Sequence, residues 1–232
     1  MIFQQKFKNK FFSAVCFKNI WPVGLSAGLF YLSFPNIFSL QGFSFCAYFF
    51  LLPLLYVLHS KTIIQRLIIG IIFGIFSYAL LVNWLFSVSP GGYVVFVLLL
   101  AVQPFLFCLL YKDHPIYIPA LWVGTEYVRE IVMGGFSWNL AFSQSFFPFI
   151  VFVNFLGPFW LCFLIVTFNC VLYQMFGRRQ RAIGALICAI AVLLMVEYTN
   201  DTKHSLSNSE ISVCAVQPNI SQQDKRDPTK LD

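Results

Sequence analysis

The chain has 232 residues, of which 59% are hydrophobic and only 10% are charged. Soluble domains carry about 25% charged residues, so this composition excludes a soluble globular enzyme, a disordered tail and a disulfide scaffold. The excess of 15 Lys and Arg over 9 Asp and Glu is expected of a membrane protein with basic cytoplasmic loops, and we expect no nucleic acid partner. The composition predicts a polytopic membrane protein.

Seven apolar runs follow one another along the sequence and predict an all-α bundle of about seven transmembrane helices. The runs lie at residues 20–34, 43–58, 63–86, 93–111, 116–133, 148–176 and 182–198. A spanning helix needs about 20 apolar residues, a length that the third, fourth and sixth runs reach alone. The other runs are extended by flanking Phe, Trp and Tyr, which suit the membrane interface.

The basic residues predict the orientation of this bundle. With the N-terminus inside, ten of the fifteen Lys and Arg fall on the cytoplasmic side: Lys6, Lys8, Lys10, Lys18, Lys61, Arg66, Lys112, Arg178, Arg179 and Arg181. The opposite loops near 35–42, 87–92 and 134–147 contain none. The positive-inside rule therefore predicts a cytoplasmic N-terminus and an extracytoplasmic tail. A signal peptide is the competing interpretation of the basic N-terminus, but no typical cleavage site follows it.

The tail changes character after the transmembrane domain, which we place at residues 1–198. Residues 199–210 are polar and predict a linker. Residues 211–216 form one short strand pattern, and the remaining residues to 232 are polar and charged. A single strand cannot bury a face by itself. Residues 211–232 therefore predict the first strand and loop of an incomplete domain.

Three charged residues, Glu126, Arg129 and Glu130, lie in or at the end of the fifth apolar run. Charges inside a membrane are costly and are usually paired or functional. Glu126 and Arg129 share a helix face because they are three residues apart. Two interpretations remain open: an ion pair at the outer interface that fixes the depth of the helix, or a role in a polar cavity.

The segment that follows, Gly134 to Asn139, contains a Gly-Gly pair and a tryptophan. Gly-Gly breaks a helix, and an outward-facing Trp138 suits the interface. The alternatives are an anchoring tryptophan and a loop that receives a lipid chain. No cysteine pair has metal-ligand spacing, and no HExxH, P-loop or GxSxG pattern occurs. We expect no metal and no cofactor.

Taken in order, these segments resemble the membrane half of the apolipoprotein N-acyltransferase family. The matching stretches are 32–35, 82–84 with 91–92, 120–122 with 125–129, 135–138, 142–144 and Asn169. In the tail, residues 216–220 with Gln223 and Lys225 look like the first strand and loop of the family's nitrilase-like domain, an α/β domain of the carbon–nitrogen hydrolase type. The resemblance covers about residues 20–232.

The resemblance implies an acyltransferase of the bacterial inner membrane. A Cys thiolate of the nitrilase-like domain takes an acyl chain from a phospholipid donor as a thioester, a Glu acts as general base and a Lys stabilises the oxyanion. The acceptor is the amine of a diacylglyceryl-Cys lipoprotein. These three groups follow the first strand in the family, so the resemblance implies no catalytic residue within 1–232. It does imply that Gly135 and Trp138 belong to a loop at the lipid entry route, with Glu126 and Arg129 as scaffold.

Two functions remain open. The first is the membrane part of an acyltransferase, truncated or completed by a separate chain that carries the nitrilase-like domain; alone, this chain is expected to be inactive. The alternative is a non-catalytic membrane scaffold that binds a lipid or a partner. A transporter would need buried charges or broken helices in paired halves, and the sequence shows neither clearly.

Overall fold

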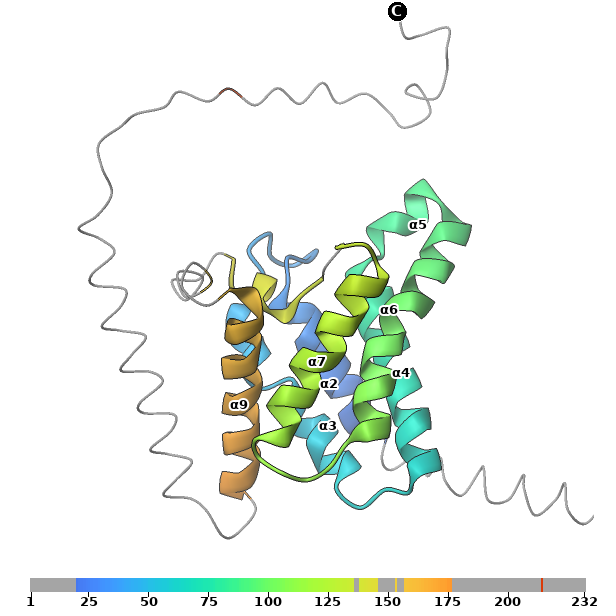
Figure 1. The fold of residues 1–232 in the computed structure, drawn as a ribbon. Coiled ribbons are helices and arrows are strands. Elements are labelled where there is room, and N and C mark those ends of the chain that lie inside the picture. Colours follow the sequence, from blue (N-terminus) through green and yellow to red (C-terminus); the bar gives the residue numbers. More distant parts are fainter. Residues whose placement is uncertain (1–19, 136–137, 146–152, 154–156, 177–213, 215–232) are drawn as a thin grey trace, which may run out of the picture.

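The structure is a computed structural model that describes residues 20–135, 138–145, 153, 157–176 and 214. These residues form seven α-helices and two short 3-10 helices and contain no β-strand (Figure 1). In chain order the elements are α2 (Ile20–Ser33), η2 (Ser44–Tyr48), α3 (Leu51–Leu58), α4 (Ile63–Leu81), α5 (Trp84–Val88), α6 (Pro90–Leu110), α7 (Tyr117–Val132), η3 (Leu140–Gln144) and α9 (Pro158–Phe176). The prediction of an all-α membrane bundle is confirmed for this part of the chain.

Six of the seven predicted apolar runs contain a described helix. Helices α4, α6 and α9 are long and apolar enough to cross a membrane, in agreement with the prediction for the third, fourth and sixth runs. The seventh run at 182–198 and the linker at 199–210 lie outside the described residues. So does the strand predicted at 211–216, apart from Cys214.

Two predicted boundaries differ from the observed ones. The run at 63–86 is divided, because α4 ends at Leu81 and the short α5 begins at Trp84. The run at 93–111 begins earlier, at Pro90, where the Ser89 hydroxyl accepts a hydrogen bond from the Gly92 N–H at 3.2 Å. Proline suits the first helical position because the N–H that it lacks would be unpaired there. Residues that resemble a loop by composition thus start a helix.

Helices α4 and α6 run antiparallel and pack against each other more extensively than any other pair of described helices (Figure 1). Two glycines on α4 face this contact. A Cβ at Gly70 would lie 2.9 Å from the Cβ of Cys108, and a Cβ at Gly74 would lie 3.0 Å from the Cα of Ala101. Small residues four positions apart let helix backbones approach closely in membranes, so the two glycines set the α4–α6 distance.

Aromatic side chains fill the centre of the bundle. The ring of Phe30 in α2 lies 5.3 Å from Phe50, 6.3 Å from Phe73, 5.7 Å from Tyr78 and 6.5 Å from Trp122, centroid to centroid. All five side chains are buried. Tilted and edge-to-face aromatic pairs contribute about 0.5–1.5 kcal/mol each beyond their buried area. The aromatic centre therefore ties α2 to the segment before α3, to α4 and to α7.

Asn169 joins α9 to η2 and to the first residue of α3. Its Oδ1 accepts a hydrogen bond from the Leu51 N–H at 3.0 Å, and its Nδ2 donates to the Ala47 carbonyl at 2.9 Å. Both bonds are buried, where an unpaired backbone group would be costly. The side chain thereby satisfies the backbone at the point where the η2–α3 segment is not regular helix.

We expect Asn169→Leu to lower the free energy of unfolding by about 1–3 kcal/mol, because the buried N–H of Leu51 loses its partner. Unfolding of the chain in detergent, followed by circular dichroism, measures the change. Thr167→Val is the matched control on the same helix, since the Thr167 hydroxyl donates within α9, to the Phe163 carbonyl at 2.7 Å. Equal stability of Asn169→Leu and the unmodified chain would contradict the assignment.

Candidate functional site

A cluster of buried polar side chains lies where the C-terminal halves of α4 and α7 meet α6, the start of α9 and the loop at 138–145. We call it the polar cluster. Its members are Tyr78, Gln103, Glu126, Arg129, Asn139 and Cys162. Glu126 and Arg129 are only 1% and 5% exposed. Burying charged groups in such surroundings is costly unless they are paired and hydrogen-bonded.

Arg129 is the centre of the polar cluster. Its Nη1 donates to the Tyr78 hydroxyl and, at 3.4 Å, to Oε1 of Gln103, while its Nη2 donates to the Trp138 carbonyl at 2.9 Å. The Tyr78 hydroxyl donates in turn to Oε1 of Gln103 at 2.9 Å. A planar guanidinium can serve several acceptors in fixed directions. Arg129 therefore connects α7 to α4, to α6 and to the loop.

Glu126 binds the same loop two residues later, at Leu140. Its Oε1 accepts a hydrogen bond from the Leu140 N–H at 2.9 Å and lies 4.0 Å from Nη2 of Arg129. The carboxylate is thus compensated by a neighbouring cation and by a backbone donor, the two kinds of partner that make a buried charge tolerable. Together, Glu126 and Arg129 form hydrogen bonds with the backbone of Trp138 and Leu140.

Asn139 and Cys162 complete the attachment of the loop to α9. The Asn139 Oδ1 accepts hydrogen bonds from the Ala141 N–H at 2.9 Å and from the Cys162 thiol. The Ala141 N–H also lies 3.2 Å from the Cys162 sulfur. In this position Asn139 caps the 3-10 helix η3, as Asn side chains commonly do at helix starts. The loop is therefore fixed by side chains from both α7 and α9.

The chain leaves α7 through two glycines. Gly134 and Gly135 have φ angles of 65° and 85°, in the left-handed region that favours glycine. The Gly135 N–H donates to the Glu130 carbonyl at 2.9 Å, which satisfies one of the carbonyls left open at a helix end. The prediction that the Gly-Gly pair ends this helix is confirmed.

The structure brings three of the four predicted site residues together. Glu126, Arg129 and the backbone of Trp138 share the polar cluster, and the Trp138 side chain packs half-buried against the hydrophobic core. Gly135 is exposed beyond the end of α7. Residues 136–137, which separate Gly135 from Trp138, lie outside the described part. Glu126 and Arg129 form the expected i,i+3 ion pair, with 4.0 Å between Oε1 and Nη2, and both also bind the backbone of the loop. A role of this pair in fixing the depth of the helix stays a prediction.

Sequence reasoning missed the other members of the polar cluster. Gln103 carried a usable signal, because a polar side chain within an apolar run usually finds a partner on another helix. Asn139 stands directly after the singled-out Trp138. Tyr78 and Cys162 gave no signal, since nothing in the sequence sets them apart from the other tyrosines and cysteines of the apolar runs. Their role follows only from the folding of α4 and α9 around α7.

The chemistry available to the polar cluster is that of positioning. Its carboxylate, guanidinium and thiol are buried and are engaged with the backbone of the loop or with one another. Within the described residues, His, Cys, Asp and Glu form no group of three that could hold a metal ion. The arrangement holds a short stretch of chain, with Trp138 at its start, in one conformation at the end of the bundle.

Comparison with known proteins yields one family. A family model described as the apolipoprotein N-acyltransferase N-terminal domain matches residues 26–171, which include every member of the polar cluster. An apolipoprotein N-acyltransferase of Geobacter metallireducens is 28% identical, and the alignment covers 94% of this chain and 46% of the relative. Apolipoprotein N-acyltransferase 1 of Treponema denticola is also 28% identical, over 70% of this chain and 31% of the relative. The chain spans less than half the length of these two relatives.

Proposed function

Because the chain belongs to the apolipoprotein N-acyltransferase family through its N-terminal domain, we propose that it supplies the membrane part of such an enzyme. The observation that carries this proposal is the pair of hydrogen bonds that join the loop backbone, at Trp138 and Leu140, to the buried Arg129 and Glu126. Two buried charges are costly inside a membrane and usually have a functional role, so we infer that the position of this loop matters for function. The proposed role of the loop is to present Trp138, with Gly135 before it, to an acyl chain arriving from the bilayer.

The substrates follow from the family. The acyl donor is a phospholipid and the acceptor is a diacylglyceryl lipoprotein, and both reach the enzyme from the membrane. An apolar bundle with a rigid loop at one end suits such substrates, because their chains remain in hydrocarbon until the reacting groups meet. A Trp side chain, with an apolar body and a polar N–H, is well placed at that boundary.

We further propose the orientation and domain layout of the chain. Three basic side chains of the described residues, Lys61, Arg66 and Lys112, lie at the end of the bundle opposite the polar cluster. The positive-inside rule places that end in the cytoplasm. The chain is then a seven-helix protein of the bacterial inner membrane with its N-terminus inside, a transmembrane domain at 1–198 and a linker at 199–210. Residues 211–232 begin an extracytoplasmic nitrilase-like domain.

Acyl transfer in this proposal is the work of the nitrilase-like domain, and no residue of 1–232 is assigned to the reacting atoms. The domain is supplied in the same polypeptide or by a separate chain. A second candidate is a non-catalytic scaffold for a lipid or a partner. It is favoured by the buried groups of the polar cluster, which bind the backbone of the loop or one another. The two candidates differ in whether the bundle supports transfer once a catalytic domain is present.

Complementation of a bacterium depleted of its own N-acyltransferase tests the proposal. Residues 1–232 are expressed alone, together with the nitrilase-like half of the Geobacter metallireducens relative, and fused to it in frame. Mass spectrometry of a lipoprotein N-terminus reports the third acyl chain. We expect acylation with the fusion and none with the nitrilase-like half by itself. Absence of acylation from a fusion that is stably present in the membrane would support the scaffold instead.

Within the active fusion, Trp138→Ala is expected to lower the rate of acyl transfer at least about tenfold, because a misplaced substrate chain loses the orientation that proximity supplies. The rate is measured in membrane vesicles at matched expression. Trp160→Ala on α9 is the matched control, since Trp160 is exposed and stacks on Phe163 of the same helix at 5.6 Å. Equal rates for Trp138→Ala and Trp160→Ala would remove Trp138 from the substrate route.

A further inference from the structure

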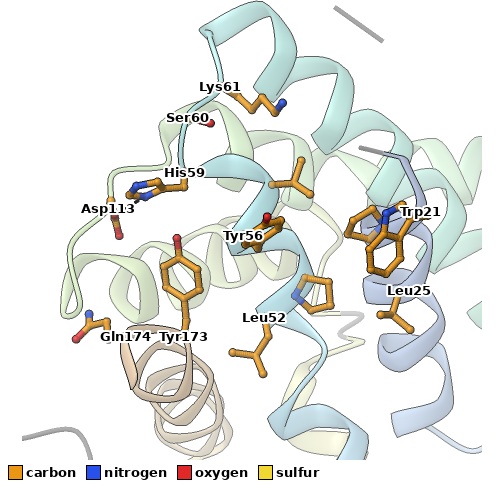
Figure 2. A pocket seen from close by; sticks show the side chains of 13 residues that line it. Trp21, Leu25, Leu52, Tyr56, His59, Ser60, Lys61, Asp113, Tyr173 and Gln174 are labelled. Atoms are coloured by element: carbon orange, nitrogen blue, oxygen red, sulfur yellow. Dashed lines mark ion pairs between the residues drawn. The ribbon is translucent and has the colours of Figure 1, made fainter. Parts of the chain in front are cut away.

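A second feature of the bundle lies at the end opposite the polar cluster. It is an open groove of about 960 Å³ between the start of α2, the length of α3 and the end of α9. The loops after α3 and after α6 close its rim (Figure 2). Ligand pockets generally measure about 300–1,000 Å³, so the groove is large enough for more than a small ion. We call it the basal groove.

The wall of the basal groove is divided by polarity. Trp21 and Leu25 of α2 and Leu52 of α3 form an apolar side, while His59, Ser60, Lys61 and Asp113 form a polar side (Figure 2). Tyr56 stands between the two sides in that view. Trp21 and Tyr56 are 66% and 72% exposed. Exposed Trp and Tyr mark the level of lipid headgroups in membrane proteins, so the groove meets the bilayer at the interface.

The charges of the basal groove favour an anion. The Lys61 ammonium forms no ion pair with any described residue. The carboxylate of Asp113 is engaged by His59, whose Nδ1 lies 2.7 Å from its Oδ2. Two further cations stand at the same end: Arg66, which donates to the Tyr111 carbonyl at 2.7 Å, and Lys112, which lies over the Tyr117 ring. Among the described residues that line the groove, Lys61 is thus the Lys or Arg side chain without an ion-pair partner, and its charge can serve a ligand.

We propose that the basal groove binds one anionic phospholipid of the leaflet at this end of the bundle. Its phosphate lies at Lys61 and Ser60, and its acyl chains run along Trp21, Leu25 and Leu52. A free phosphate would use the polar side alone and leave the apolar wall open. A phospholipid satisfies both sides, because its headgroup and chains are separated as the wall is. This lipid sits at the opposite end from the loop of the proposed acyl-transfer function, and its binding does not depend on that function.

Native mass spectrometry of the 232-residue chain in detergent tests the proposal, with phosphatidylglycerol as the probe and phosphatidylcholine as the neutral comparison. We expect a bound phosphatidylglycerol to be retained in preference to phosphatidylcholine. Lys61→Gln is expected to reduce that retention about fivefold, the effect of one basic residue near an anionic lipid. Lys61→Arg keeps the charge and is expected to keep the lipid.

Lys112→Gln is the matched control, because it removes the same charge from the same end without touching the groove. We expect it to change retention less than twofold. Equal losses for Lys61→Gln and Lys112→Gln, or no preference for phosphatidylglycerol, would overturn the proposal. Circular dichroism confirms that each variant is folded.

The position of the chains is tested separately. Phosphatidylglycerol with a photoreactive group in one acyl chain is expected to label peptides that contain Trp21, Leu25 or Leu52. Labelling confined to other helices would overturn the proposal.

Discussion

An Arg129→Ala variant is expected to lose about 3–5 kcal/mol of unfolding free energy, because it leaves the Glu126 carboxylate buried beside no cation. The substitution also removes the donors to the Tyr78 hydroxyl, to Gln103 and to the Trp138 carbonyl. Three elements therefore lose a shared partner at once: α4, α6 and the loop. Unfolding of the chain in detergent by a denaturing surfactant, followed by circular dichroism, gives the change.

Glu130→Gln is the control for this variant. Glu130 is the next residue on the same helix, is half-buried and forms no ion pair with a described residue, so its neutralisation should stay within about 0.5 kcal/mol. The double variant Glu126→Gln/Arg129→Ala should be more stable than Arg129→Ala alone, since no charge is then left uncompensated. A loss below about 1 kcal/mol for Arg129→Ala would show that the polar cluster does not hold the loop.

The helices of the bundle were predictable because apolar composition and length decide which segments cross a membrane. Two prolines show where that reasoning stops. Pro90 and Pro158 each stand at the first position of a helix, although proline in a sequence usually indicates a turn or a loop. Composition alone does not distinguish the start of a helix from a loop, because a capping side chain such as Ser89 determines where the helix begins.

The candidate site was predictable only in part. Glu126 and Arg129 were identified because charges in an apolar run need a reason, but their partners are a tyrosine, a glutamine and two backbone groups of a later loop. Those contacts join residues 9 to 51 positions apart, so no local pattern encodes them. The i,i+3 ion pair that the sequence indicated is present, with 4.0 Å between Oε1 of Glu126 and Nη2 of Arg129, but the hydrogen bonds of both side chains to other groups were not predicted. The basal groove was not predicted, because it requires three helices and two loops to meet.

Replacing Gly70 or Gly74 with Ala is expected to lower the free energy of unfolding by about 1–3 kcal/mol each, through overpacking of the α4–α6 contact. The new Cβ at Gly70 would lie 2.9 Å from the Cβ of Cys108 and 3.0 Å from the Cα of Phe105. At Gly74 it would lie 3.0 Å from the backbone of Ala101. Backbone atoms of a packed helix cannot rotate aside as a flexible side chain can, so α4 and α6 must separate.

Gly124→Ala on α7 is the control that separates overpacking from the intrinsic effect of glycine. No atom lies within 4 Å of a Cβ built at Gly124, so this substitution should be neutral or should stabilise the helix by up to about 1 kcal/mol. The Gly70→Ala/Gly74→Ala double variant should cost less than the sum of the single variants, because one separation of the helices relieves both contacts. Destabilisation of Gly124→Ala equal to that of the α4 variants would place the effect in the helix itself and not in the α4–α6 contact.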